Sequence, residues 1–164
     1  MSQHRSRHLR GGVLTHASCH LYRGQLMRKI EARMVNAVRD LLGNAAHAGT
    51  YYRLGNTEVS QSHHGVHGTF SYQRIISVHL HGFEICAIRP DCEQSLWVSD
   101  CGWQTATTKS RLNVLLSCFT AGQGLYQKAF NWFESDGEPW NGSALYSFRP
   151  QWDAYQFKQA EAIG

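Results

Sequence analysis

The stretch from residue 25 to residue 42 limits the fold most, because its apolar residues recur on one side of a helix. They follow the spacing i, i+4, i+8, i+12 and i+15, at Leu26, Ile30, Met34, Val38 and Leu41. This period places one stripe on the helix surface, which another element must cover. Gly43 and Asn44 then supply a stop signal. We therefore predict a helix over residues 25–42.

After residue 54 the apolar spacing changes from a helical period to the alternation of β-strands. We predict a loop over 61–68 and strands over 57–60, 69–80, 83–89 and 94–99. His81-Gly82 is typical of a two-residue hairpin turn, and Pro90-Asp91 of another turn. The expected inner face of the central hairpin consists of Phe70, Tyr72, Ile76, Val78 and Leu80, continued by Phe83, Ile85 and Ala87.

A second helix is predicted over residues 108–120, where Leu112, Leu115, Leu116 and Phe119 form one stripe. Thr107 is the expected N-cap, and Gly122 ends the helix. Residues 125–134 are ambiguous between helix and strand, and their alternation favours a strand that opens a hairpin with residues 144–148. The last residues, 151–164, are predicted to be a tail or a short helix.

These elements together predict a single α+β domain over residues 25–150, in which two helices pack on one face of an antiparallel β-meander. The length of 164 residues suits one domain with a packed core. Residues 1–24 are rich in Arg and contain no Asp or Glu, so we interpret them as a flexible basic arm. The same composition also fits an organellar transit peptide, which remains an alternative.

Charge is distributed unevenly along the chain. Residues 1–47 carry eight Lys/Arg and two Asp/Glu, whereas residues 48–164 carry eight and ten. No apolar run approaches the roughly 20 residues of a membrane span, and no signal-peptide core is visible, so we expect a soluble protein. The basic first third is the expected electrostatic contact region.

Cysteine and histidine give little support for a disulfide framework or a metal site. The five cysteines are Cys19, Cys86, Cys92, Cys101 and Cys118, an odd number without regular spacing, which fits free thiols in a reducing compartment. Of the histidines, only the pair His63 and His67 has a spacing typical of zinc ligands. We predict no metal and no cofactor.

Several short segments resemble a family of small proteins encoded by bacteriophages and without an assigned function. They are Met27-Arg-Lys-Ile-Glu31, Leu54-Gly-Asn-Thr-Glu-Val59, Leu80-His-Gly82, Gly102-Trp103, Thr107-Thr-Lys-Ser-Arg-Leu-Asn113 and Tyr126-Gln-Lys128 with Trp132. The resemblance covers about residues 27–135, and members of the family begin near the position of Met27. The segment from Glu138 onward is not matched. The resemblance implies a phage context and an α+β fold, and it supplies no catalytic residue.

The start of the second helix is the main candidate site. It combines hydroxyl groups, backbone N–H groups and two cations at the positive end of the helix dipole, in Thr107, Thr108, Lys109, Ser110 and Arg111. Cations are disfavoured there, which indicates a site for a phosphate or carboxylate. The alternative is that the hydroxyls cap the helix while the cations pair with a nearby acid. Arg28 and Lys29 form a second basic group for nucleic-acid phosphates.

No catalytic signature is present: the sequence lacks a P-loop, a nucleophile elbow and a zinc-protease helix. We therefore predict a non-catalytic phage accessory protein in the cytoplasm of a bacterial host, contacting nucleic acid or a host protein that handles it. One alternative is a protein inhibitor of a host enzyme or defence complex, with Trp140 and Trp152 as exposed anchors. An enzyme of unrecognised type is the other.

Overall fold

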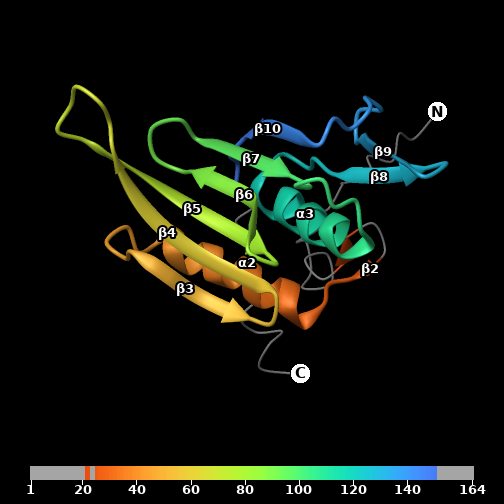
Figure 1. Cartoon of the computed structure of the whole chain (residues 1–164), viewed down its shortest axis with the longest axis horizontal. Coiled ribbons are helices and arrows are strands. Elements are labelled where there is room, and N and C mark those ends of the chain that lie inside the picture. Colours follow the sequence, from red (N-terminus) through yellow and green to blue (C-terminus); the bar gives the residue numbers. More distant parts are fainter. Residues whose placement is uncertain (1–20, 23–24, 151–164) are drawn as a thin grey trace, which may run out of the picture.

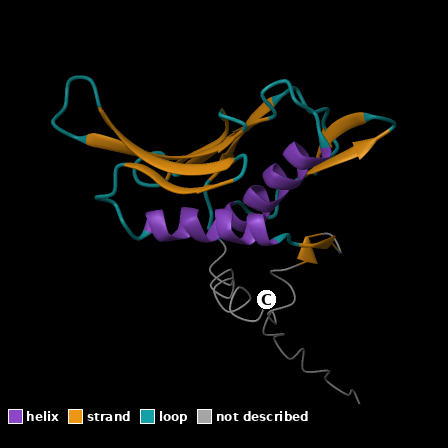
Figure 2. Ribbon diagram, turned by 60° about the horizontal axis from the view of Figure 1, so that its bottom comes forward, coloured by secondary structure: helices purple, strands orange, loops and turns teal. Residues whose placement is uncertain are grey.

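The computed structural model describes residues 21–22 and 25–150. In this part of the chain, two helices pack on one face of an antiparallel sheet, as Figures 1 and 2 show. The helices are α2 (Lys29–Leu42) and α3 (Ala106–Phe119). The six sheet strands are β3 (Gly49–Leu54), β4 (Thr57–Gly65), β5 (Tyr72–Leu80), β6 (Phe83–Arg89), β7 (Ser95–Ser99) and β10 (Ser143–Ser147). The predicted α+β meander with two helices on one face is confirmed.

Two short ribbons lie outside the main sheet. The first pairs β1 (Leu21–Tyr22) with β2 (Gln25–Leu26), and the second pairs β8 (Leu125–Lys128) with β9 (Asn131–Glu134). The helix over 25–42 therefore begins later than predicted, at Lys29, because residues 25–26 belong to β2. The predicted end of this helix at Gly43 is confirmed.

The core lies between the helices and the inner face of the sheet. Strands contribute Val59, Ile76, Val78, Cys86, Ile88, Leu96 and Val98, and helices contribute Met34, Val35, Val38, Leu41, Leu112, Leu115, Leu116 and Phe119. Each fully buried large apolar side chain adds about 1.5–3 kcal/mol to stability. The apolar stripes predicted for the two helices are thus the surfaces that hold them on the sheet.

The predicted loop over 61–68 is wrong in its first part, because residues 61–65 belong to strand β4 and continue the sheet. Gln61 interrupted the apolar alternation, although its side chain points inward and is buried. Its Nε2 donates to the carbonyls of Asn44, Ala45 and His47 at 3.0, 3.3 and 2.8 Å. Strand β3 was not predicted, because an exposed edge strand lacks an apolar face.

The hairpin of β5 and β6 has the predicted turn, with φ of 53° at His81 and 82° at Gly82. A bulge between Val78 and His79 shifts the register by one residue, so Val78 pairs with Cys86. A one-residue shift reverses the faces of a strand. The prediction that Ala87 lies on the inner face is therefore wrong: Ala87 pairs with Ser77 on the opposite face.

The last strands are paired differently from the prediction. The segment 125–134 forms its own hairpin, β8–β9, rather than a hairpin with residues 144–148. Strand β10 instead returns to the main sheet beside β7, giving the order β10-β7-β6-β5-β4-β3. Arg149 N donates to Phe119 O at 2.7 Å, which holds the end of this strand against α3. The prediction missed the pairing because β7 and β10 are separated by α3 and a complete hairpin.

Neither described helix is long and apolar enough to cross a lipid bilayer. The predicted arm over residues 1–24 falls mainly outside the described residues, and the predicted tail over 151–164 falls wholly outside them.

Candidate functional site

The helix start that the sequence singles out begins two residues earlier than predicted. Thr105, not Thr107, is the N-cap of α3, and its Oγ1 accepts from Thr108 N at 3.1 Å. The hydroxyls of Thr105 and Thr108 also lie 2.9 Å apart in a hydrogen bond. Thr107 is half-buried and Thr108 is buried. The cap of α3 is therefore completed within the chain.

Arg111 and Ser110 both point at a carboxylate of the protein itself. Arg111 Nη1 lies 2.7 Å from Oε1 of Glu31, and the Ser110 hydroxyl donates to the same oxygen. The other oxygen, Oε2, accepts from Arg28 N at 3.0 Å at the start of α2. Arg111 and Glu31 are only 3% and 2% exposed. The carboxylate beside this part of α3 is thus supplied by α2.

Burial lowers the pKa of the Arg111 guanidinium, and the negative charge of Glu31 opposes this shift. A guanidinium nevertheless stays protonated in proteins. The pair is therefore a buried ion pair, whose partners depend on each other because neither is solvated by water. Its geometry joins the starts of the two helices.

Lys109 points away from this pair and toward the β8–β9 hairpin. Its Nζ donates to Oε1 of Gln127 at 2.9 Å and lies 5.7 Å from the ring centroid of Trp132. Of the predicted contact residues, Arg28 and Lys29 are exposed, at the start of α2. The structure thus brings Arg28, Ser110 and Arg111 together around Glu31, whereas Lys109 serves another contact.

An apolar pocket of about 310 Å³ opens beside the start of α3. It lies between the β5–β6 turn, the loop after β7 and the first turn of α3. Its lining comprises Leu80, His81, Phe83, Ile85, Asp100, Cys101, Trp103, Thr105 and Thr108. Thr108 is the predicted site residue that reaches it. This volume is at the lower end of the range typical of ligand pockets, roughly 300–1,000 Å³.

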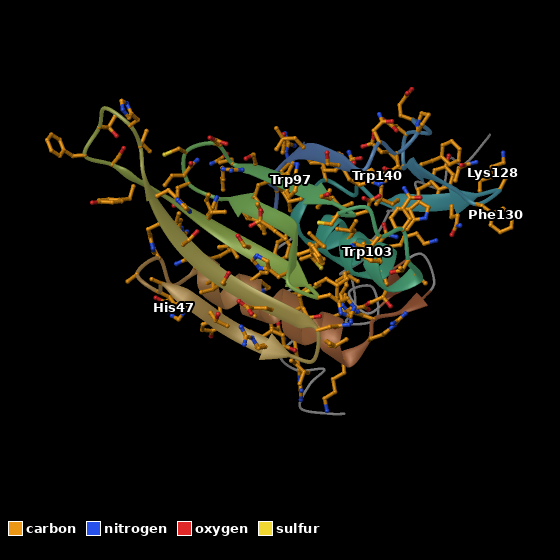
Figure 3. All side chains as sticks on the ribbon, in the orientation of Figure 1. His47, Trp97, Trp103, Lys128, Phe130 and Trp140 are labelled. Atoms are coloured by element: carbon orange, nitrogen blue, oxygen red, sulfur yellow. The ribbon has the colours of Figure 1, made fainter. Side chains whose placement is uncertain are left out.

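The rim of the pocket carries two exposed aromatic rings. Phe83 is 50% exposed and Trp103 is 59% exposed, and their ring centroids lie 6.4 Å apart. Leu80 and Ile85 are buried and supply the apolar wall. Figure 3 labels Trp103 among the side chains of the loop that follows β7. The pocket therefore presents apolar surface from its wall to its edge.

The carboxylate in the pocket wall is fully engaged. Asp100 is buried and accepts from Gly102 N at 2.8 Å, from Gln104 Nε2 at 3.1 Å and from Trp140 Nε1 at 2.8 Å. The predicted role of Trp140 as an exposed anchor is wrong, because the indole is 7% exposed and holds this carboxylate. Trp152, the other predicted anchor, lies outside the described residues.

Other polar side chains of the lining also have partners within the protein. The Cys101 thiol donates to the carbonyl of Glu84 at 3.0 Å. The Nε2 of His81 lies 3.1 Å from the side-chain amide nitrogen of Asn56. The two threonine hydroxyls bond to each other, as described above. What the pocket offers a ligand is chiefly apolar contact.

The histidines on β4 make isolated contacts. His63 Nε2 lies 2.7 Å from the carbonyl of Ala45, and His64 Nε2 lies 2.9 Å from the Ser62 hydroxyl. Within residues 21–22 and 25–150, no three His, Cys, Asp or Glu side chains are placed to hold one metal ion.

Charge over residues 25–150 is almost balanced, since this part of the chain carries eleven Lys/Arg and ten Asp/Glu. Sequence reasoning therefore emphasised cations that the structure largely uses internally, and it missed the pocket. The sequence signal that could have indicated the pocket was an aromatic residue directly after each of two glycine turns. These residues are Phe83 after Gly82 and Trp103 after Gly102.

The segments that carried the family resemblance contact each other in the structure. Glu31 joins Arg111, and Lys109 joins Gln127. A family model described as Kyanoviridae Gp96 protein matches residues 27–151, so the match reaches into the segment from Glu138 onward, which was expected to be unmatched. No curated protein and no solved structure matches the chain. The chain belongs to the Kyanoviridae Gp96 protein family of phages.

Proposed function

We propose that this phage protein is a non-catalytic binding module that takes an apolar side chain of a partner protein into the pocket beside α3. One observation carries the proposal: the polar side chains of the lining are engaged within the protein, while Phe83 and Trp103 remain exposed. A pocket of this kind gains free energy chiefly from apolar burial.

The partner we propose is a host protein in the bacterial cytoplasm. It is either a protein that handles nucleic acid or an enzyme or defence complex that the phage protein inhibits. Aromatic residues are the usual anchors of such contacts, because they bury a large area with few rotatable bonds. The volume of about 310 Å³ accommodates one leucine or phenylalanine side chain from the partner.

Direct nucleic-acid contact is a second candidate, supported by the exposed Arg28 and Lys29 and by the arginines of residues 1–24. The near balance of charge over residues 25–150 weighs against it, because such binding depends on phosphate neutralisation. Arg111 is a poor residue with which to test it, because its removal leaves Glu31 buried without its cation.

The decisive experiment is a pull-down from host lysate, with and without nuclease, followed by identification of the captured protein and measurement of its affinity. We expect capture to survive nuclease and the affinity to fall about tenfold or more in Trp103→Ala. Leu145→Ala is the matched control, because Leu145 is 65% exposed but lies on β10, outside the pocket lining. Equal losses in both variants would count against the pocket.

A gel-shift titration tests the second candidate separately. Direct binding requires an affinity that falls steeply with salt and falls further in Arg28→Ala/Lys29→Ala. Capture that disappears after nuclease treatment, together with such a salt-dependent shift, would replace the protein-binding proposal by the nucleic-acid one.

A further inference from the structure

The turn of the β8–β9 hairpin has a backbone conformation that its residues disfavour. Lys128 pairs with Asn131, so the turn consists of Ala129 and Phe130 alone. Their φ angles are 48° and 67°. A two-residue turn with two positive φ angles favours Asn-Gly, since side chains with a Cβ are strained in this region. The chain thus places an alanine and a phenylalanine where neither is favoured.

Packing within the chain does not compensate for this strain at Phe130. Its side chain is 91% exposed, and Figure 3 shows it at the far end of the hairpin, away from the body of the molecule. Strained residues cluster at functional sites, so an observed outlier is a starting point for a functional hypothesis. The exposed ring gives the reason to look for a partner at this tip.

The base of the hairpin is firmly held. The Asn113 side chain donates to the carbonyl of Leu125 at 2.9 Å and accepts from its N–H at 2.6 Å. On one face the rings of Tyr126 and Phe133 stack with centroids 5.5 Å apart, and on the other Trp132 is buried. The tip is therefore presented on a rigid support, which lowers the entropy lost when a partner binds.

We propose that the β8–β9 tip is a second protein contact, in which Phe130 enters an apolar cleft of a partner protein bordered by carboxylates. The charge argument comes from Lys128, which is exposed and is the one charged residue in the segment 127–133. A single cation beside a phenyl ring complements an apolar cleft with an acidic edge. This contact is independent of the pocket, which none of these residues lines.

The first test replaces Phe130 by the photoreactive p-benzoylphenylalanine in the full chain, expressed in phage-infected host cells. We expect light-dependent cross-links to one protein, mapping to an apolar cleft with Asp or Glu at its edge. The same photoreactive residue at position 145 is the control. Cross-links no stronger than this control, cross-links to nucleic acid, or cross-links to a second copy of this chain would each overturn the proposal.

The second test uses the variant Ala129→Asn/Phe130→Gly, which keeps the turn and removes the ring. We expect its Tm to rise by about 2–4 °C, because the strain is relieved, while affinity for the cross-linked protein falls about tenfold. An unchanged affinity would show that the phenyl ring has no contact role, and a lowered Tm would show that the turn is not strained. Trp103→Ala separates the two proposals. If only the pocket proposal fails, Trp103→Ala keeps its affinity for the cross-linked protein, whereas Ala129→Asn/Phe130→Gly loses it.

Discussion

The start of α3 and the pocket beside it share Thr108 but differ in how their chemistry is used. At the helix start, Arg111 faces inward and forms a buried ion pair with Glu31. At the pocket, the polar groups are engaged within the wall and the aromatic rings face water. Charge therefore serves the fold in the first region, and apolar exposure marks the candidate contact in the second.

A residue's type alone therefore does not assign its role, because the role depends on the groups that the residue contacts. Two cations near a helix start are unusual, but a buried carboxylate accounts for Arg111. Two aromatic rings after glycine turns are unremarkable in a sequence, but in this structure they edge a cavity. Removal of one group at a time from each region should distinguish the stabilising contacts from the binding contacts.

Removal of Glu31 should have the largest effect. Glu31→Ala leaves Arg111 buried without its anion, so we expect a loss of about 3–5 kcal/mol in the free energy of unfolding, measured by urea titration. Glu31→Leu/Arg111→Met should recover most of this loss, because no buried charge remains. If Glu31→Ala lowered the free energy of unfolding by less than about 1 kcal/mol, the result would contradict a structural role for the ion pair.

Removal of Asp100 should come next. Asp100→Ala frees two side-chain donors and one backbone donor, and hydrogen bonds to a charged group contribute about 1.5–3 kcal/mol each. Because water reaches some of the freed groups, we expect a net loss of about 2–3 kcal/mol in thermal unfolding. Trp140→Phe, which removes one of the three bonds, should lose less. Equal losses would assign the whole effect to the Trp140–Asp100 hydrogen bond.

Removal of Lys109 should cost little stability. Its contacts to Gln127 and the Trp132 ring are partly exposed, so Lys109→Ala should lower the free energy of unfolding by about 0.5–1 kcal/mol. Chemical denaturation and a gel-shift assay on the same variant provide the measurements. Unchanged stability together with weaker nucleic-acid binding would restore Lys109 as a ligand contact.

The pocket rim should be the least sensitive in stability. Trp103→Ala is expected to change the free energy of unfolding by less than about 0.5 kcal/mol, because the indole is 59% exposed. Occupancy of the pocket should instead slow alkylation of Cys101, with the exposed Cys92 as the reference thiol. Cys86 should stay unreactive, because burial raises the pKa of its thiol. Equal protection of Cys92 would show that the partner binds elsewhere.

The periodicity of the sequence was sufficient to predict the fold class, both helices and the central strands. This works because the buried face of a helix or strand requires apolar residues at the spacing of that element. It failed where one residue broke the pattern. Gln61 is polar but buried, and a bulge beside Val78 moved Ala87 to the other face. Neither event has a local sequence signal, since each depends on a neighbouring segment.

The candidate site was less predictable, because its contacts join distant parts of the chain. Glu31 and Arg111 are 80 residues apart, and Trp140 reaches Asp100 across 40 residues. Sequence spacing reports neighbours on one element and does not show which elements meet. The same limit hid the pocket, whose wall comes from two strands, a loop and a helix start.

The return of β10 to β7 also has a consequence for the order of assembly. Strands β3 to β6 each pair with the next strand in the chain, so only short loops must close. The pairing of β10 with β7 must close a longer segment, because α3 and the β8–β9 hairpin lie between these two strands in the chain. Contacts of this kind form late in folding. We expect amide hydrogen exchange to show β10 opening more readily than β6, so that this sheet edge is the last to form and the first to open.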